Sequence, residues 1–240
     1  MGLQGAIILV VGGGSGIGFA VAQAALSEGA QVTIASTNAD KLAAASLRMG
    51  GAATALLDIT NEAAVAAYFA SSGMFDHIVS TAGDWGDGGR GRFADLDMTA
   101  AEELFRVRLW GSAILAKHGA ARLTADGSLT FTGGMSAYRP AKGSVMATAM
   151  AGSLAHLTLG LAKELAPLRV NAVFPGGVAT EVYQVLSDST KAAWQARFGS
   201  QPIPRIGEPD EVAQAYLYLM KAGYTTGQIL QVDGGSMLAG

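Results

Sequence analysis

Short apolar runs alternate with longer segments of helical periodicity from one end of the chain to the other. The runs are apolar at successive positions, which is typical of strands in a parallel sheet that is covered by helices on both faces. Parallel strands need crossover connections, and the intervening helices supply them with the usual right-handed sense. The alternation therefore predicts β–α repeated six times and a final strand, which is a three-layer, doubly wound parallel sheet of seven strands in the α/β class.

The pattern of apolar residues and good helix formers places each element along the chain. We expect strands at Ala6–Val11, Gln31–Ala35, Thr54–Leu57, His77–Thr81, Ser128–Thr132, Arg169–Phe174 and Gln228–Val232. We expect helices at Ile17–Glu28, Asp40–Met49, Glu62–Ser71, Thr99–Leu123, Ser144–Leu165 and Pro209–Ala222. No Pro-rich or Ser-rich linker divides the chain, so residues 1–240 are predicted to form a single domain.

Composition argues against several classes of function. The 16 Lys and Arg residues against 19 Asp and Glu give a net charge of -3 without a basic cluster, so neither nucleic acid nor an anionic membrane is an expected partner. The chain has no cysteine, and His77, His118 and His156 lack the spacing of metal ligands, so no metal site is expected. The N-terminal apolar run has no basic flank, and no later stretch reaches about 18 uninterrupted apolar residues. We therefore expect a soluble, cytoplasmic protein with a small-molecule ligand.

The first predicted strand runs through a glycine-rich turn directly into the first helix. Glycine lets the backbone turn sharply and approach a pyrophosphate, and the free N–H groups of a helix N-terminus favour an anion. A tight turn can need glycine for packing alone, but the strand before it, the helix after it and the β–α repeat favour nucleotide binding by a Rossmann fold. The expected cofactor contacts in this turn are Gly12, Gly14, Ser15, Gly16, Ile17 and Gly18.

The end of the second strand bears on the choice between NAD and NADP. An NAD site usually has an acidic residue there, which accepts hydrogen bonds from the ribose hydroxyls. Here the strand ends in Ser36 and Thr37, and the nearby Asp40 is expected to cap a helix instead. Small hydroxyl side chains leave room for a 2′-phosphate, so Ser36 and Thr37 are expected cofactor contacts that favour NADP over NAD.

The chain, including its glycine-rich turn at residues 12–18, resembles the short-chain dehydrogenase/reductase family over its whole length. The spacing Gly12-x-x-x-Gly16-x-Gly18 is the family's version of the glycine turn. Residues 57–60 resemble its Asp-Val-Thr segment, residues 80–83 resemble its Asn-Asn-Ala-Gly segment, and residues 169–180 resemble the stretch that holds the nicotinamide. Residues 204–213 and 226–235 resemble its C-terminal signatures.

The resemblance implies a nicotinamide cofactor, a homo-oligomer that is commonly a tetramer or otherwise a dimer, and in most members the interconversion of an alcohol and a ketone. It also implies a single dinucleotide-binding domain, 1–240, with a substrate loop near 178–205. Further cofactor contacts are implied at Asp58, Ile59, Thr81, Ala82, Gly83, Pro175, Gly176, Val178 and Thr180.

The catalytic Tyr-x-x-x-Lys of the family is not found at its usual place. In the family it lies on the fifth helix, at a fixed distance before the Glu of a Leu-Ala-x-Glu-Leu motif. That Glu is Glu164 here, so the Tyr position falls on Ala147 and the Lys position on Ala151. The family's catalytic Ser position falls on Gly134, and its Asn position falls on Arg108. All four positions are changed, and the catalytic residues of this chain are therefore unknown.

Tyr138 and Lys142 have the spacing of the catalytic pair, but they lie nine residues too early in the chain. Placing them on the helix would require about two and a half extra turns. It would also put Pro140 in the helix interior, where proline removes a hydrogen bond and clashes with the preceding turn. We expect both residues in the loop after the fifth strand.

Two hypotheses on function follow, and a third fits less well. The first is an oxidoreductase that reduces an iminium or a conjugated alkene, because a general acid contributes about 10²–10⁴ to ketone reduction and is missing here. Its candidate replacement residues are Asp84, Trp85, Tyr183 and Arg108. Three of them have a structural alternative: Asp84 as a turn residue, Tyr183 as a rim or packing aromatic and Arg108 as a member of a structural ion pair. The second hypothesis is a catalytically inactive nucleotide-binding or interaction protein. Non-redox catalysis fits worse, because relatives of that kind normally keep a Ser and a Tyr.

Overall fold

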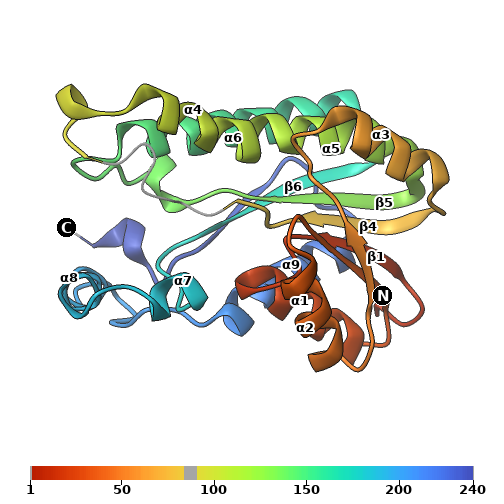
Figure 1. Ribbon diagram of the computed structural model, residues 1–240, viewed down its shortest axis with the longest axis horizontal. Helices are drawn as coiled ribbons and strands as arrows, with labels where there is room; N and C mark the ends of the chain where they lie inside the picture. The colour runs from red at the N-terminus through yellow and green to blue at the C-terminus, as the bar shows by residue number, and fades with distance from the viewer. Residues whose placement is uncertain (1, 84–90, 240) are drawn as a thin grey trace.

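The computed structural model describes residues 2–83 and 91–239, which form a seven-stranded parallel sheet between two layers of helices (Figure 1). The strand order is β3-β2-β1-β4-β5-β6-β7, and every neighbouring pair is parallel. The doubly wound sheet of seven strands expected from the sequence is confirmed. Its strands are β1 (Ile7–Val11), β2 (Gln31–Ser36), β3 (Ala53–Leu56), β4 (Phe75–Ser80), β5 (Leu123–Thr132), β6 (Arg169–Pro175) and β7 (Ile229–Val232).

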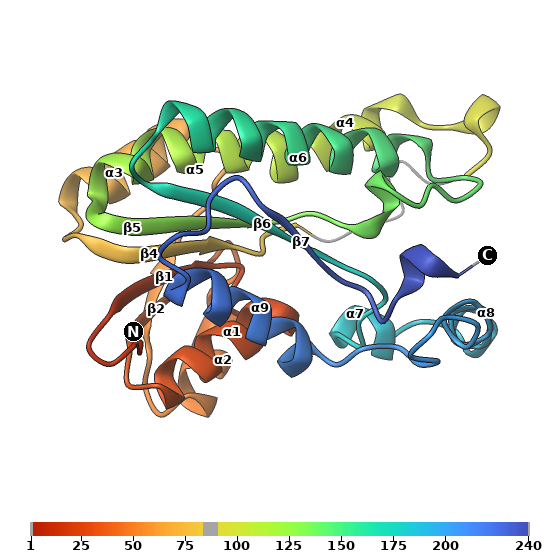
Figure 2. The ribbon, with the colours of Figure 1, turned by 180° about the vertical axis from the view of Figure 1, so that it is seen from behind.

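The helices are divided between the two faces of the sheet (Figures 1 and 2). One face is covered by α3 (Glu62–Ser71), α4 (Met98–Phe105), α5 (Gly111–Gly119) and α6 (Val145–Glu164). The other is covered by α1 (Gly16–Ser27), α2 (Ala39–Arg48) and α9 (Pro209–Lys221). Two further helices, α7 (Glu181–Gln184) and α8 (Asp188–Phe198), lie beyond the carboxyl end of β6, on the same side of the molecule as the C-terminus.

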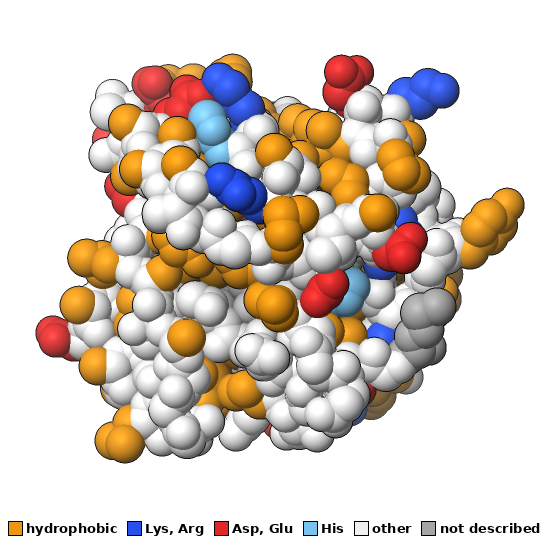
Figure 3. Space-filling model, turned by 90° about the vertical axis from the view of Figure 1, so that its right-hand side faces the viewer, with side chains coloured by type: hydrophobic (Ala, Val, Ile, Leu, Met, Phe, Trp, Pro, Cys, Tyr) orange, Lys and Arg blue, Asp and Glu red, His pale blue; other side chains and the backbone are white. Residues whose placement is uncertain are grey.

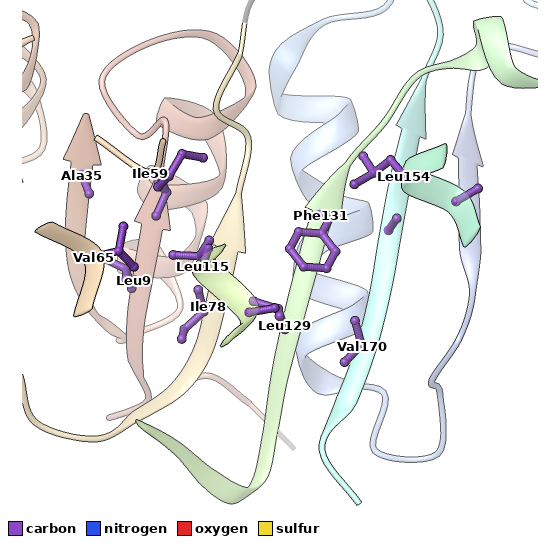
Figure 4. Packing of buried hydrophobic residues seen from close by; sticks show 14 of the residues in the cluster. Leu9, Ala35, Ile59, Val65, Ile78, Leu115, Leu129, Phe131, Leu154 and Val170 are labelled. Atoms are coloured by element: carbon purple, nitrogen blue, oxygen red, sulfur yellow. The ribbon is translucent and has the colours of Figure 1, made fainter. Parts of the chain in front are cut away.

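Each face of the sheet buries its own hydrophobic core. Alternate residues of β1 point to opposite faces, so Leu9 packs under α3, α5 and α6 while Ile8 packs under α1 and α9. Figure 4 shows the first of these cores, in which Phe131 lies between Leu129 and Leu154. Because both faces are buried, the strands need apolar residues at successive positions, which is the pattern that predicted a parallel sheet.

The predicted helix over Thr99–Leu123 is interrupted in the structure. A π-helical turn, Arg106–Trp110, separates α4 from α5, and Leu123 already belongs to β5. A π turn inserts one extra residue and rotates the side chains that follow, and here it places Arg108 in the interior with 4% of its surface exposed. The apolar periodicity continues through such a turn, so the sequence pattern did not reveal it.

One cap residue differs from the sequence expectation, and one region contains two helices that the sequence did not predict. Asn38, not Asp40, caps α2, because its side-chain oxygen accepts a hydrogen bond of 2.8 Å from Lys41 N and Asp40 lies within the first turn. The region 178–205 was expected to be a substrate loop and contains α7 and α8. Only Phe198 of α8 is buried, so this helix has no apolar stripe that a periodicity search could find.

Helix α6 is long and apolar enough to cross a membrane by length and composition, and within the described part of the chain it is the one helix that meets both criteria. One side of it lies in the core, where Met150 and Leu154 are fully buried. A core helix of an α/β domain passes the same test, and the packing of α6 on β6 fits that explanation.

His77 is buried near the amino end of β4, and Figure 3 shows the face of the molecule at this edge of the sheet, with small groups of charged side chains among scattered hydrophobic ones. Its Nδ1 atom lies 2.9 Å from Ser128 Oγ, which is itself fully buried. Burial, and secondarily the charge of Arg169, lower the pKa of His77 to about 4, while Asp76 opposes the shift. The folded protein therefore holds this imidazole neutral under conditions in which the unfolded chain protonates it.

The lowered pKa predicts a loss of stability in mild acid. An imidazole whose pKa is lower in the folded state stabilises the fold above pH ~6.5, and this contribution is lost as the pH falls through that value towards about 4. Between about pH 7.5 and about pH 5, the free energy of unfolding in urea should fall by about 2 kcal/mol more in the wild type than in His77→Gln. The same substitution at the exposed His156 is the control and should leave the wild-type dependence intact. Equal pH profiles for all three proteins would contradict the prediction.

Candidate functional site

The glycine turn between β1 and α1 packs directly against the end of β4. A Cβ atom at Gly12, which has a φ of +86°, would lie 2.6 Å from Thr81 Oγ1. A Cβ atom at Gly18 would lie 2.3 Å from the Gly12 carbonyl oxygen. These distances are shorter than any real contact of a Cβ atom, so the fold itself requires glycine at both positions.

Gly14 has a different environment within the same turn. A Cβ atom there would lie 3.6 Å from Lys41 Cβ, which is an ordinary van der Waals distance, so packing does not require glycine. Ser15 is the N-cap residue of α1, makes no side-chain capping bond in the structure described, and is followed by a first turn without acidic residues. The positive end of α1 thus lies beside backbone that a ligand can approach, as an anion site needs.

Three segments far apart in the sequence meet at this turn. Thr81 donates from both its N–H and its hydroxyl to the Val11 carbonyl, at 2.8 and 3.2 Å, which joins the end of β4 to the end of β1. On the other side, a Cβ atom at Gly16 would lie 3.1 Å from Thr180 Cγ2. The structure therefore brings together the predicted cofactor residues of 12–18, 80–83 and 175–180 at the carboxyl edge of the sheet, where doubly wound folds bind ligands.

The predicted adenosine contacts lie at the ends of β2 and β3. Thr37 is exposed, and Ser36 Oγ accepts a hydrogen bond of 3.3 Å from Asn38 N. The exposed Asp58 accepts hydrogen bonds at Oδ1 from Thr60 N at 2.9 Å and from Thr60 Oγ1 at 2.7 Å, which fixes the direction of its carboxylate. Its neighbour Ile59 is buried, and a Cβ atom at Gly111 would lie 2.8 Å from it.

Lys41 is a residue that sequence reasoning missed. It lies in the first turn of α2, and its side chain is exposed. Its Cβ atom faces Gly14 of the glycine turn. The signal that could have found it is its position three residues after the cap residue Asn38, because this places a cation beside the end of β2.

Tyr138 and Lys142 lie in the segment between β5 and α6, so the prediction that they are loop residues is confirmed. Tyr138 follows a short 3₁₀ turn, Met135–Ala137, and its ring centroid lies 5.8 Å from that of Phe174. Helix α6 begins only at Val145. Ala147 and Ala151 are on this helix, both buried in the core beneath it.

The candidate replacement residues have distinct surroundings. Arg108, buried at the π turn, donates from its guanidinium group to the Gly83 carbonyl. Gly83 has a φ of +107°, and a Cβ atom there would lie 2.8 Å from Arg108 Cγ, so the arginine stem lies directly under the end of β4. Tyr183 packs against Trp194 with ring centroids 5.7 Å apart, which matches its packing alternative. Asp84 and Trp85 lie outside the described residues.

The other predicted nicotinamide contacts are at the end of β6. Pro175 closes this strand, Gly176 N donates to the Val232 carbonyl at 3.0 Å, and Val178 is buried and bridges to Gly207. Among residues 2–83 and 91–239, no group of three or more His, Asp or Glu side chains could hold a metal ion. The candidate site therefore consists mainly of backbone at the carboxyl edge of the sheet, and the buried Arg108 lies under the end of β4.

Comparison with known proteins gives consistent matches over the whole chain. The family model described as enoyl-(acyl carrier protein) reductase matches residues 11–237. The short-chain dehydrogenase/reductase ATR9 of Stachybotrys chlorohalonatus is 32% identical and covers 98% of both chains. The short-chain dehydrogenase/reductase malC of Malbranchea aurantiaca is 33% identical, covering 98% of this chain and 96% of its own.

Solved structures agree with these matches. A small-chain dehydrogenase in complex with NADPH has a TM-score of 0.85 and 35% identity, covering 98% of this chain and 100% of its own. The MalC reductase/Diels-Alderase of Malbranchea aurantiaca has a TM-score of 0.89 and 32% identity, covering 98% of each chain.

The contrast between Gly18 and Gly14 gives a direct test of the turn. Gly18→Ala forces a Cβ atom against the Gly12 carbonyl and should lower the free energy of unfolding in urea by about 1–3 kcal/mol, as overpacking does. Gly14→Ala meets only ordinary contacts and should stay within about 0.5 kcal/mol of the wild type. Equal losses in both variants would show that the packing of this turn is described wrongly.

Proposed function

The chain belongs to the short-chain dehydrogenase/reductase family, and from this premise we propose that it is an NADP(H)-dependent reductase whose acceptor needs no phenol from the protein. The similar structures support a nicotinamide cofactor, since one is a complex with NADPH. The matched enoyl-(acyl carrier protein) reductase family and the similar MalC reductase/Diels-Alderase are both reductases by name, which supports the direction of the reaction.

The crevice fits a dinucleotide by its chemistry. The free N–H groups at the start of α1, beside Gly14 and Ser15, would hold the pyrophosphate, and packing alone does not explain the glycine at position 14. By the family resemblance, Asp58 would hold the adenine, while Val178 and Thr180 would hold the nicotinamide carboxamide. The contact between Gly16 and Thr180 supports a single continuous site.

NADP fits the adenosine end better than NAD. The position where an acid usually accepts hydrogen bonds from the ribose hydroxyls is Thr37, and the nearby Asp40 is in the first turn of α2. Ser36 and Thr37 offer hydroxyl donors, and the Lys41 ammonium group is a cation within the same turn of chain. A 2′-phosphate would therefore find donors and positive charge where a bare ribose would find no carboxylate at position 37.

The acceptor must be activated before hydride arrives. Bound reduced nicotinamide would supply the hydride. Hydride transfer to a ketone makes an alkoxide that needs a proton, but Ala147 and Ala151 carry only methyl groups and Tyr138 is outside the helix. An iminium carbon needs no proton, because the hydride and the cationic C=N bond together give a neutral amine. A conjugated alkene is the second class, since hydride addition gives a delocalised enolate that the Arg108 guanidinium would stabilise and that takes its proton from water.

The observation that carries this proposal is the buried pair of methyl groups, Ala147 and Ala151, at the positions of α6 where the family has its Tyr and Lys. A catalytically inactive nucleotide-binding or interaction protein is the other outcome that the tests below can return. The cytoplasmic location and the homo-oligomeric state expected from the sequence stay predictions.

The first test compares the two nucleotides. Titration followed by NADPH and NADH fluorescence should give at least tenfold tighter binding of NADPH, a difference of about 1.4 kcal/mol. Thr37→Asp should abolish this preference, because a carboxylate repels the 2′-phosphate and accepts the ribose hydroxyls of NADH. Leu47→Asp adds the same charge at an exposed position of α2 and is the control. Equal nucleotide affinities in the wild type would contradict the NADP assignment.

The second test compares acceptors at saturating NADPH. An N-alkyl dihydroisoquinolinium salt should be reduced at least about 10²-fold faster than cyclohexanone, because only the ketone depends on a general acid. Cyclohexenone tests the conjugated class, and reactions without protein correct for the direct reduction of the iminium salt. Equal rates for ketone and iminium would overturn the proposed chemistry. NADPH binding without consumption by any acceptor would favour the inactive binding protein.

A further inference from the structure

A buried chain of hydroxyl groups links α9 to the end of β4. The hydroxyl of Tyr216, which is fully buried, lies 2.6 Å from Thr132 Oγ1, and Thr132 Oγ1 donates to the Ser80 carbonyl at 2.7 Å. A threonine hydroxyl has one hydrogen, and the carbonyl can only accept. The Tyr216 hydroxyl must therefore be the donor to Thr132, which gives the chain one direction, from α9 through β5 to β4.

The bond from Thr132 to Ser80 lies just beyond the point where the backbone pairing of β4 and β5 stops. The last paired residues of the two strands are Val79 and Thr130. Beyond that point β5 stays with β6, since Thr132 pairs with Val173 and Gly133 N donates to the Val173 carbonyl at 2.9 Å. The Thr132 side chain thus joins the diverging strands at the place where no ladder bond does.

The segment that receives this bond, residues 80–83, is the floor of the proposed cofactor crevice. Thr81 bonds to Val11 and touches Gly12 and Gly18, while the Gly83 carbonyl accepts from Arg108. Ser80 is held in a third way, because its carbonyl oxygen accepts the hydrogen bond from the Thr132 hydroxyl. The position of residues 80–83 therefore depends on the glycine turn 12–18, on Arg108 and on the hydroxyl groups of Thr132 and Tyr216.

The phenol of Tyr216 is a costly group to bury. Burial raises its pKa well above the usual value, with smaller opposing effects from the bond to Thr132 and from the charge of Arg108, so it stays a donor at any working pH. Its ring packs in the core that α9 shares with α1, the helix that follows the glycine turn. A phenylalanine would fill this space without a polar atom, so the hydroxyl calls for a reason beyond packing.

We propose that Tyr216 and Thr132 are positioning residues that fix the segment 80–83 under the nicotinamide dinucleotide and so tune cofactor affinity. Both side chains are buried, so neither would touch the cofactor. The role of the pair rests on the proposed function for the identity of that cofactor, but the ordering of the segment is a property of the free protein.

The test compares Tyr216→Phe with Tyr218→Phe, the same substitution at two tyrosines of α9, of which Tyr216 is fully buried and Tyr218 is 53% exposed. Loss of a buried hydrogen bond that orders a binding surface should raise the Kd for NADPH about three- to tenfold in Tyr216→Phe. Amide hydrogen exchange in residues 78–83 of the free protein should also accelerate. Tyr218→Phe should change neither quantity.

Two substitutions of Thr132 give a second comparison, because one keeps the hydroxyl group and the other removes it. Thr132→Ser keeps the hydroxyl and should bind NADPH within about twofold of the wild type. Thr132→Val leaves both the Tyr216 donor and the Ser80 carbonyl without their partner, so it should raise the Kd more than Tyr216→Phe does.

A purely structural role has a different signature. In that case Tyr216→Phe would lower the free energy of unfolding but leave the Kd and the exchange of residues 78–83 as in Tyr218→Phe, and the positioning role would be overturned. If the wild type binds neither NADPH nor NADH, the proposed function fails instead, and the exchange rates alone decide whether the hydroxyl chain orders this segment.

Discussion

The fold and its crevice depend on one close contact, between the glycine turn after β1 and the end of β4. No Cβ atom fits at Gly12 or Gly18, because Thr81 and the turn's own backbone occupy the space. This contact sets α1 against the sheet and points its N-terminus at the carboxyl edge. A Cβ atom at Gly14 would make only ordinary contacts, so the proposed anion site lies beside a turn whose other glycines are required by packing.

Most of the fold could be predicted from the sequence, because its strands and helices are defined by local periodicity. The helix over Glu62–Ser71 has the predicted bounds, since Asn61 caps it and a break follows Ser71. The π turn at Arg106–Trp110 could not be predicted, because one inserted residue leaves the apolar pattern almost unchanged. Helix α8 was missed because a helix with a single buried residue has no stripe to recognise.

The candidate site was predictable where it is built from consecutive backbone, and not where it is built from distant side chains. The three glycine-containing segments meet as expected, because the carboxyl ends of parallel strands share one edge. The hydrogen bond between Thr132 and Tyr216 joins residues that are 84 positions apart, so neither local sequence predicts it. Arg108 was singled out by resemblance, but its bond to Gly83 depends on the π turn and so needed the structure.

The proposed function places a nicotinamide dinucleotide beside α6, on which Ala147 and Ala151 offer no proton donor. A crystal structure of the full chain with NADPH tests it most directly. The account predicts the dinucleotide along residues 12–18, with no hydroxyl or amine of α6 within about 3.5 Å of the nicotinamide ribose or of the face that delivers hydride. Tyr138 and Lys142 drawn onto the nicotinamide and its ribose would contradict it, because the chain would then have a phenol and an amine at the reacting centre.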